Sequence, residues 1–301
     1  MLIQIDPLDS RWKSAYNPIR ICATGRSLSM KVRDKLWLFA SRAHDDDIWL
    51  GKTHEQRFTR RSRITPAEGA AMLDVPNVIM VVSDGVPAPY SKDAYGYMES
   101  FCRMQNVVWS VSGSGGFRAG NEEQFVCELA KRYPNVTGAF ADDFMCMPDA
   151  APEENEKKRQ EIRKVRETLD TAVRPLSMWL TLYTHNLADC DPAMWSTFDA
   201  LSMWTWNYAD LRNLQENFEL MEKKFPQQKK YLGVYILDYP SGMPVPNEYM
   251  QLQCEFGLSL LKQQRIDGMI FLTNCVMGVG LPSEYWLRDW IDQVKNIDLP
   301  D

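Results

Sequence analysis

Aspartates stand at the ends of several short apolar runs in this chain, where side chains could meet at one edge of a folded domain. Asp142 and Asp143 end the run at 136–143, and Asp238 ends the run at 231–238. Two carboxyl groups that flank a glycosidic bond can cleave it, because one protonates the leaving oxygen while the other attacks the sugar or activates water. Cleavage of a sugar linkage is therefore the first chemistry to consider for these residues.

Aromatic and polar side chains occur at the ends of the same runs or just after them. Indole and phenol rings present apolar faces that can stack on sugar C–H groups, while short polar side chains can bind hydroxyls. The residues expected to hold a substrate are His44, Asp45, Asp84, Tyr183, His185, Trp204, Trp206, Asn207, Tyr239 and Asn274. The expected ligand is a carbohydrate or another small polar molecule.

The same residues have structural interpretations that remain open at this stage. Asp142 and Asp143 could cap the segment that follows them, and Asp238 could hold a backbone group at a strand end. Trp204 and Trp206 would share one face of a strand, where they could be either core or a sugar platform.

Eight apolar runs, separated by amphipathic stretches, indicate the elements that would position these side chains. The runs lie at 36–43, 78–83, 107–112, 136–143, 177–184, 201–206, 231–238 and 269–274. Their length and their content of Val, Ile, Trp and Tyr favour strands. Helices are expected from Thr65 onward and at 122–132, 153–173, 210–225, 246–264 and 283–297.

Alternating strands and helices predict a parallel sheet, and eight such strands close into a (β/α)₈ TIM barrel. We therefore expect an α/β fold with one barrel over residues 35–301. A short N-terminal extension, 1–34, with a strand at 19–23, would pack on it. A doubly wound open sheet is the alternative, but the glycine-rich turn GxGxxG that typifies dinucleotide-binding forms does not occur after a strand.

Active sites of such barrels lie at the carboxyl ends of the strands, which gathers the acids around one mouth. Asp143 and Asp238, on the fourth and seventh strands, would then face each other as the catalytic pair. The small residues Ala139 and Ala141 fit a crowded interior, so the alternation of side chains points Asp143 to the pore and Asp142 to the wall. Asp142 is accordingly expected to be a supporting acid.

Composition and spacing exclude several other classes. No lysine lies at a strand end, which argues against a Schiff-base aldolase, and no HxH follows the first strand, as a metal-dependent amidohydrolase would need. Residues 45–47 form an acidic run without the spacing of an EF-hand loop, so neither a metal nor another cofactor is predicted.

The charge balance and the cysteines bear on partners and location. The net charge of −6 argues against a nucleic-acid partner, and no apolar run approaches the length of a membrane span. The seven cysteines are scattered without a CxxC pair, and residues 1–13 do not resemble an export signal. A cytoplasmic location is expected, while the oligomeric state is left open.

Four segments carry a resemblance to known proteins. They are GAFADDF at 138–144, ALSMWTWN at 200–207, YLGVYILDYPSG at 231–242, and the run at 248–275. The chain resembles bacterial (β/α)₈-barrel proteins that are uncharacterised or described as glycoside hydrolases. The resemblance implies sugar binding or glycoside cleavage by aspartates at strand ends. Asp143 and Asp238 match by position the acid pair of a large clan of retaining glycosidases, which has glutamates there.

Two other functions fit a barrel with this mouth. One is an isomerase, epimerase or lyase acting on a free sugar or sugar acid, with His185 or an aspartate as base and a divalent metal as an option. The other is a carbohydrate-binding barrel without catalysis. Fold alone does not choose among them.

Overall fold

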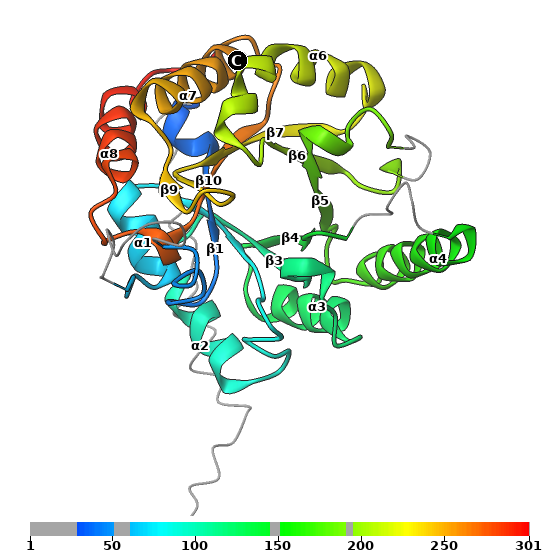
Figure 1. Cartoon of the computed structure of the whole chain (residues 1–301). Helices are drawn as coiled ribbons and strands as arrows, with labels where there is room; N and C mark the ends of the chain where they lie inside the picture. The colour runs from blue at the N-terminus through cyan, green and yellow to red at the C-terminus, as the bar shows by residue number, and fades with distance from the viewer. Residues whose placement is uncertain (1–28, 51–60, 145–150, 191–194, 301) are drawn as a thin grey trace, which may run out of the picture.

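Eight parallel strands form a closed barrel in the computed structural model of the chain, which describes residues 29–50, 61–144, 151–190 and 195–300 (Figure 1). The barrel strands are β1 (Leu36–Ala40), β2 (Asn77–Met80), β3 (Asn106–Ser112), β4 (Val136–Ala141), β5 (Ser177–Tyr183), β6 (Ala200–Trp204), β7 (Lys229–Tyr235) and β10 (Gly268–Leu272). Each strand pairs with the next along the chain, and β10 closes the ring against β1. The predicted (β/α)₈ barrel is confirmed.

Helices surround the barrel, as Figure 1 shows. They are α1 (Pro66–Leu73), α2 (Lys92–Ser100), α3 (Glu122–Arg132), α4 (Pro152–Leu169), α6 (Leu214–Lys224), α7 (Asn247–Lys262) and α8 (Pro282–Val294). Short 3₁₀ helices are η2 (Val32–Lys35), η3 (Ser114–Gly116), η4 (Thr184–Asn186), η5 (Tyr208–Asn213) and η6 (Asn274–Val276). Thr65 caps α1 and exchanges hydrogen bonds with Glu68, as the sequence predicts. The sequence did not single out α2, whose buried face consists of only Ala94 and Met98.

The barrel interior is filled by layers of aromatic side chains. Trp37, Trp179 and Tyr231 pack together near the amino ends of the strands, with ring centroids 4.1 to 6.0 Å apart. Above them Phe39 contacts both Phe140 and Trp204. These layers fill the barrel interior below the carboxyl ends of the strands, the face at which such barrels place their active sites.

A glycine makes room for the upper aromatic layer. A Cβ at Gly233 would lie 2.1 Å from the ring of Trp204, so only glycine allows this indole to cross the barrel beside β7. The indole Nε1 donates to Ser202, two residues earlier on the same strand. Trp204 therefore forms a fixed floor for the space above it.

The seventh strand ends earlier than the sequence predicts. The barrel strand β7 stops at Tyr235, and the chain then forms a small antiparallel ribbon between β8 (Leu237–Asp238) and β9 (Met243–Pro244). The run at 231–238 is buried throughout, but Leu237 and Asp238 pair with β9 and not with a barrel strand. Asp238 consequently lies on this ribbon and not at the end of a barrel strand.

Both ends of the described chain lie together on the barrel. Val32 is fully buried and donates its backbone N–H to Ile297, while Lys31 bridges to Asp298. The expected strand at 19–23 falls outside the described residues. Within the described part of the chain, no helix has the length and apolar character needed to cross a bilayer.

Candidate active site

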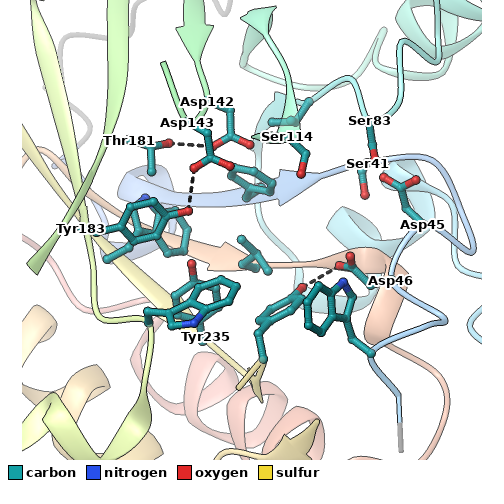
Figure 2. Close-up of a pocket in the computed structure, with 17 residues that line it drawn as sticks. Ser41, Asp45, Asp46, Ser83, Ser114, Asp142, Asp143, Thr181, Tyr183 and Tyr235 are labelled. Atoms are coloured by element: carbon teal, nitrogen blue, oxygen red, sulfur yellow. Dashed lines mark hydrogen bonds between the residues drawn. The ribbon is translucent and has the colours of Figure 1, made fainter. Parts of the chain in front are cut away.

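A pocket of about 160 Å³ opens at the carboxyl ends of the barrel strands (Figure 2). Its lining combines acids, aromatic rings and hydroxyl groups drawn from many of the strand ends. The lining residues are Phe39, Ser41, Asp45, Asp46, Trp49, Val81, Ser83, Ser114, Asp142, Asp143, Thr181, Tyr183, Trp204, Trp206, Tyr235, Tyr239 and Leu272. The position agrees with the rule that barrel active sites lie at this face.

Asp142 is the buried acid of the pocket. It follows Phe140 by two residues, and Phe140 contacts Phe39 inside the barrel, so the even-numbered side chains of β4 point inward. The phase expected from Ala139 and Ala141 was therefore wrong. One carboxylate oxygen of Asp142 accepts a hydrogen bond from Thr181 at 2.9 Å. Burial, followed by repulsion from the charge of Asp143, raises the pKa of Asp142 well above its usual range.

Asp143 reaches the same pocket by a turn of the backbone. Its φ of 47° is left-handed, which swings its side chain toward the mouth directly after β4 ends. Its Oδ2 accepts from the backbone N–H of Gly115 at 2.9 Å, and its Oδ1 accepts from the Tyr183 hydroxyl at 2.9 Å. The two neighbouring aspartates thus both line the pocket, one buried and one half-buried at its edge.

Tyrosines form a second part of the wall. Burial raises the pKa of Tyr183, Tyr235 and Tyr239 well above the usual phenol value, and the nearby aspartate charges raise it further. All three hydroxyls therefore stay protonated and can donate hydrogen bonds. Trp206 stacks on Tyr239, with centroids 5.4 Å apart and planes at 21°, and meets Tyr183 edge-on.

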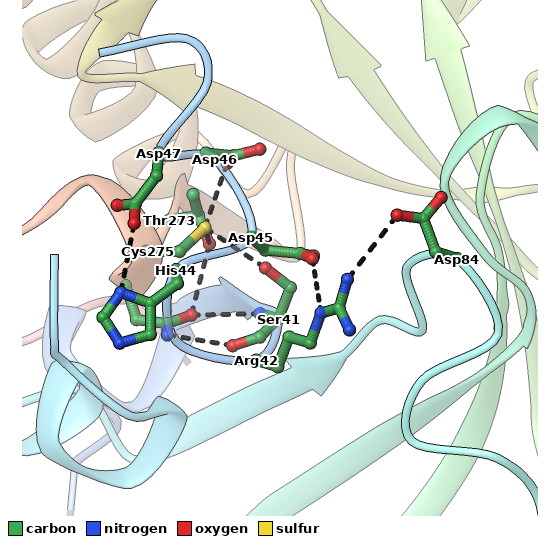
Figure 3. Close-up of polar contacts among 10 residues, drawn as sticks. Ser41, Arg42, His44, Asp45, Asp46, Asp47, Asp84, Thr273 and Cys275 are labelled. Carbon is green, nitrogen blue, oxygen red and sulfur yellow. Dashed lines mark hydrogen bonds and ion pairs between the residues drawn. The ribbon is translucent and has the colours of Figure 1, made fainter. Parts of the chain in front are cut away.

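Asp45 and Asp46 enter the pocket from the segment after β1, on a different part of the wall from Asp142. Oδ2 of Asp46 accepts from the Tyr239 hydroxyl at 2.6 Å. The same oxygen accepts from the Cys275 thiol at 3.0 Å (Figure 3). Burial raises the pKa of Asp46, and these two hydrogen bonds oppose the rise. Asp46 is also among the charges that raise the pKa of Asp142, so the two carboxylates act on each other.

Asp45 forms an ion pair with Arg42. The guanidinium Nε of Arg42 lies 2.8 Å from its carboxylate, and the other end of this guanidinium reaches Asp84 at 3.5 Å (Figure 3). Arg42 thereby joins the loops after β1 and β2.

Asp238 does not line the pocket, contrary to the expected geometry. Its Oδ1 accepts from the backbone N–H of Tyr208 at 3.1 Å, and its Oδ2 accepts from the backbone N–H and the hydroxyl of Ser241. It is 3% exposed, so little of the carboxylate is open to a ligand. The ribbon that follows β7 turns this side chain to structural contacts, and at this strand it is Tyr235 that lines the pocket.

Half of the ten expected substrate residues line the pocket. These are Asp45, Tyr183, Trp204, Trp206 and Tyr239. Trp204 and Trp206 could each have been a core residue or a platform for a sugar. Trp204 is buried and forms the floor of the pocket, while Trp206 is partly exposed and forms part of its wall.

The other five expected residues lie outside the lining for identifiable reasons. His44 has a φ of 72° and an exposed ring held by Asp47 at 3.1 Å. Asp84, whose side chain is 88% exposed, lies at the rim beside Arg42. The exposed ring of His185 stacks behind Tyr183, with centroids 5.3 Å apart. Asn207 caps η5 through the backbone N–H of Ala209.

Asn274 is structural as well. Its buried amide accepts from the backbone N–H of Ser41 and donates to the carbonyls of Ser41 and Ile64. These bonds fasten the end of β1 to the loop that leads into α1.

The pocket lining also contains residues that were not predicted from the sequence, among them Asp46, Trp49, Thr181 and Tyr235. Tyr235 and Thr181 could have been found from alternation, since Tyr231 and Trp179 point inward on the same strands. Asp46 directly follows the predicted Asp45, but alternation does not select it, because both lie in the irregular segment after β1. No group of three or more His, Cys, Asp or Glu side chains in the described residues is arranged to hold a metal ion.

Comparison with known proteins gives the fold of this chain and no family. No protein-family profile matches it, and no curated protein sequence matches it. A GH113 β-mannanase from Alicyclobacillus acidocaldarius is 13% identical, over 88% of this chain and 98% of that one, with a TM-score of 0.51. A GH99 endo-α-mannosidase from Bacteroides thetaiotaomicron is 8% identical over 87% and 97%, also at 0.51.

A third similar structure is a glycoside hydrolase family 5 enzyme from Prevotella bryantii, 11% identical over 88% of this chain and 99% of that one, with a TM-score of 0.51. At such identities the likeness establishes the barrel alone. The class that fold and comparisons define is therefore a TIM-barrel protein.

Proposed function

We propose that this protein is a glycoside hydrolase, with Asp142 as the proton donor and Asp46 as the opposing carboxylate. The observation that carries the proposal is that carboxylates enter one aromatic-lined pocket from two separate parts of the barrel wall, after β4 and after β1. Glycosidic cleavage uses one acid on the leaving group and one carboxylate on the sugar, and two acids on separate parts of one pocket wall can take these two roles.

Environment distinguishes the two roles. A proton donor must hold its proton at the working pH, and Asp142 is the more deeply buried acid, with the charge of Asp143 beside it. Asp46 accepts two hydrogen bonds, from Tyr239 and Cys275, which favour its ionised form as nucleophile or base. Trp206 and the tyrosines supply faces on which a sugar ring can stack.

The test is hydrolysis by the purified chain of aryl glycosides in both anomeric forms, together with oligosaccharides. Asp142→Asn is expected to lower kcat by about 10²–10⁴-fold on substrates with poor leaving groups. The loss of kcat in Asp142→Asn should be much smaller on glycosyl fluorides, because the fluoride ion leaves without needing a proton. Asp46→Asn is expected to lose activity on both kinds of substrate.

A surface acid provides the matched control. Asp289 is exposed on α8, so Asp289→Asn should keep wild-type kinetics. Asp142→Asn and Asp46→Asn that hydrolyse every substrate as fast as wild type would refute the assignment of these residues. A panel without any turnover by the wild-type protein would refute glycoside hydrolysis of those linkages.

A further inference from the structure

The charged residues that line the pocket are all acids. They are Asp45, Asp46, Asp142 and Asp143, and of these Asp45 alone forms an ion pair with a described cation, Arg42, at 2.8 Å. The other three acids, of which Asp142 is the proposed proton donor, converge on a cavity of about 160 Å³, where water screens charges less than at an open surface. A ligand with a positive charge would therefore gain electrostatic energy on entering.

The uncharged part of the lining favours the same kind of ligand. Aromatic rings form a continuous part of the wall, and they are those of Tyr183, Tyr235, Tyr239 and Trp206. The centroids of neighbouring rings in this set, and of Tyr235 and the floor residue Trp204, lie 5.1 to 6.1 Å apart. The faces of such rings carry negative electrostatic potential and attract ammonium groups. Rings and carboxylates thus act together on a cation.

Asp143 has no acid or base role in the proposed chemistry, where it acts only through the effect of its charge on Asp142. Its two oxygens are fixed by the Gly115 N–H and the Tyr183 hydroxyl, so its position does not depend on a ligand. Both contacts are donors, which leaves further lone pairs on the carboxylate to accept from another group. Figure 2 shows Asp143 beside Asp142, directed with it toward the pocket.

We propose that the pocket selects a sugar that carries a protonated amino group, and that Asp143 receives this ammonium. The sugar part of this inference rests on the proposed function, whereas the preference for a positively charged amine rests on the lining alone. A neutral sugar would leave Asp143 without a charged partner, and a sugar acid would bring a like charge toward the carboxylate of Asp143.

Binding by such a ligand would change the protonation of the site. In the free pocket, burial and the charge of Asp143 raise the pKa of Asp142 well above its usual range, and burial raises the pKa of Asp46 against the two hydrogen bonds that it accepts. An ammonium beside these carboxyl groups would lower their pKa values, so protons should be released when it binds.

The experiment measures binding of matched free sugars by calorimetry or ligand-observed NMR. Glucosamine, galactosamine and mannosamine are compared with glucose, galactose and mannose, with the N-acetylated amines, and with glucuronate. At least one amine is expected to bind about tenfold or more tightly than its neutral parent and its N-acetyl form, as a charge-assisted hydrogen bond implies. Glucuronate is expected to bind weakest.

The variant Asp143→Asn tests the residue, and Asp289→Asn on α8 serves as the matched control. Asp143→Asn should lower the ratio of amine affinity to parent affinity by about tenfold, while Asp289→Asn should keep the ratio. Calorimetry in two buffers with different ionisation enthalpies should show net proton release with the amine. A folded Asp143→Asn that keeps the full preference for the amine would overturn the role of Asp143.

The outcomes separate this inference from the proposed function. Equal affinity for amines and their parents overturns the inference, even where neutral glycosides are hydrolysed. Selective amine binding supports the inference, and it does so even if no aryl glycoside or amino-sugar glycoside is cleaved, a result that counts against the proposed function alone.

Discussion

The hydroxyl of Tyr183 donates a hydrogen bond to Oδ1 of Asp143 at 2.9 Å and thereby links the ends of β5 and β4 at the mouth of the barrel. Tyr183 remains a donor because burial, and then the charges around it, raise its pKa above the usual phenol value. Asp143 is consequently held in a left-handed conformation from two sides, by Tyr183 and by the N–H of Gly115.

Tyr183→Phe removes this donor and keeps the ring. Asp143 then loses one of two hydrogen bonds to its carboxylate, and kcat/KM is expected to fall by about tenfold, since a hydrogen bond to a charged group contributes roughly 1.5–3 kcal/mol. Steady-state kinetics on the best substrate of the panel measures the effect. Tyr285→Phe, at an exposed tyrosine of α8, is the control, and equal kinetics for both variants would argue against the link.

Asp142→Asn should stabilise the protein while it removes activity. Burial and the charge of Asp143 raise the pKa of Asp142 in the folded state, so folding favours its protonated form. The resulting stability is fully present below the unfolded-state pKa and is lost as the pH rises through the folded-state pKa. Asparagine stays neutral and still accepts from Thr181, so it does not incur this loss.

The measurement is the Tm of wild type and Asp142→Asn at pH 4 and pH 7. The Tm of the variant minus the Tm of wild type should be larger at pH 7 than at pH 4. The increase should be about 2 °C or more for each kcal/mol by which burial of the charge destabilises the wild type. A Tm difference that is the same at both pH values would show that ionisation of Asp142 does not destabilise the folded protein.

Cys275 is expected to tune Asp46 through its thiol. Burial raises the pKa of Asp46, and hydrogen bonds from Cys275 and Tyr239 counter the rise. Cys275→Ala removes one donor, so the pKa of Asp46 should rise further, and the acid limb of the kcat/KM profile should move to higher pH. Cys275→Ser keeps a donor and should lie closer to wild type. An acid limb that does not move in Cys275→Ala would indicate that Asp46 does not control it.

Asp238→Asn distinguishes a structural aspartate from a catalytic one. The amide loses acceptor capacity for the backbone N–H and hydroxyl of Ser241, so the free energy of unfolding should fall by about 1–3 kcal/mol. Below its Tm the variant should retain kcat within about threefold of wild type, because Asp238 does not line the pocket. Denaturant unfolding and kinetics on one preparation give both values. A loss of kcat of about a hundredfold without a loss of stability would restore Asp238 to the catalytic pair.

The barrel itself followed from the sequence, because hydrophobic runs and helical periodicity are local properties. Eight runs predicted the eight strands, and the cap at Thr65 and the stretch at 122–132 predicted helices that begin where expected. Asp142, Asp143, Trp204 and Trp206 were also within reach of the sequence, since each belongs to a strand or follows it directly.

Tertiary structure determines which residues at the ends of the strands point into the pocket. Alternation predicts side-chain direction only while the backbone stays extended. Left-handed residues, His44, Asp84 and Asp143 among them, break that alternation after β1, after β2 and after β4. The ribbon after β7 likewise takes Asp238 away from the pocket, so that Tyr235 lines the pocket at this strand. Such turns depend on hydrogen bonds between segments far apart in the sequence, such as those of Asp143 with Gly115 and Tyr183, which no local pattern encodes.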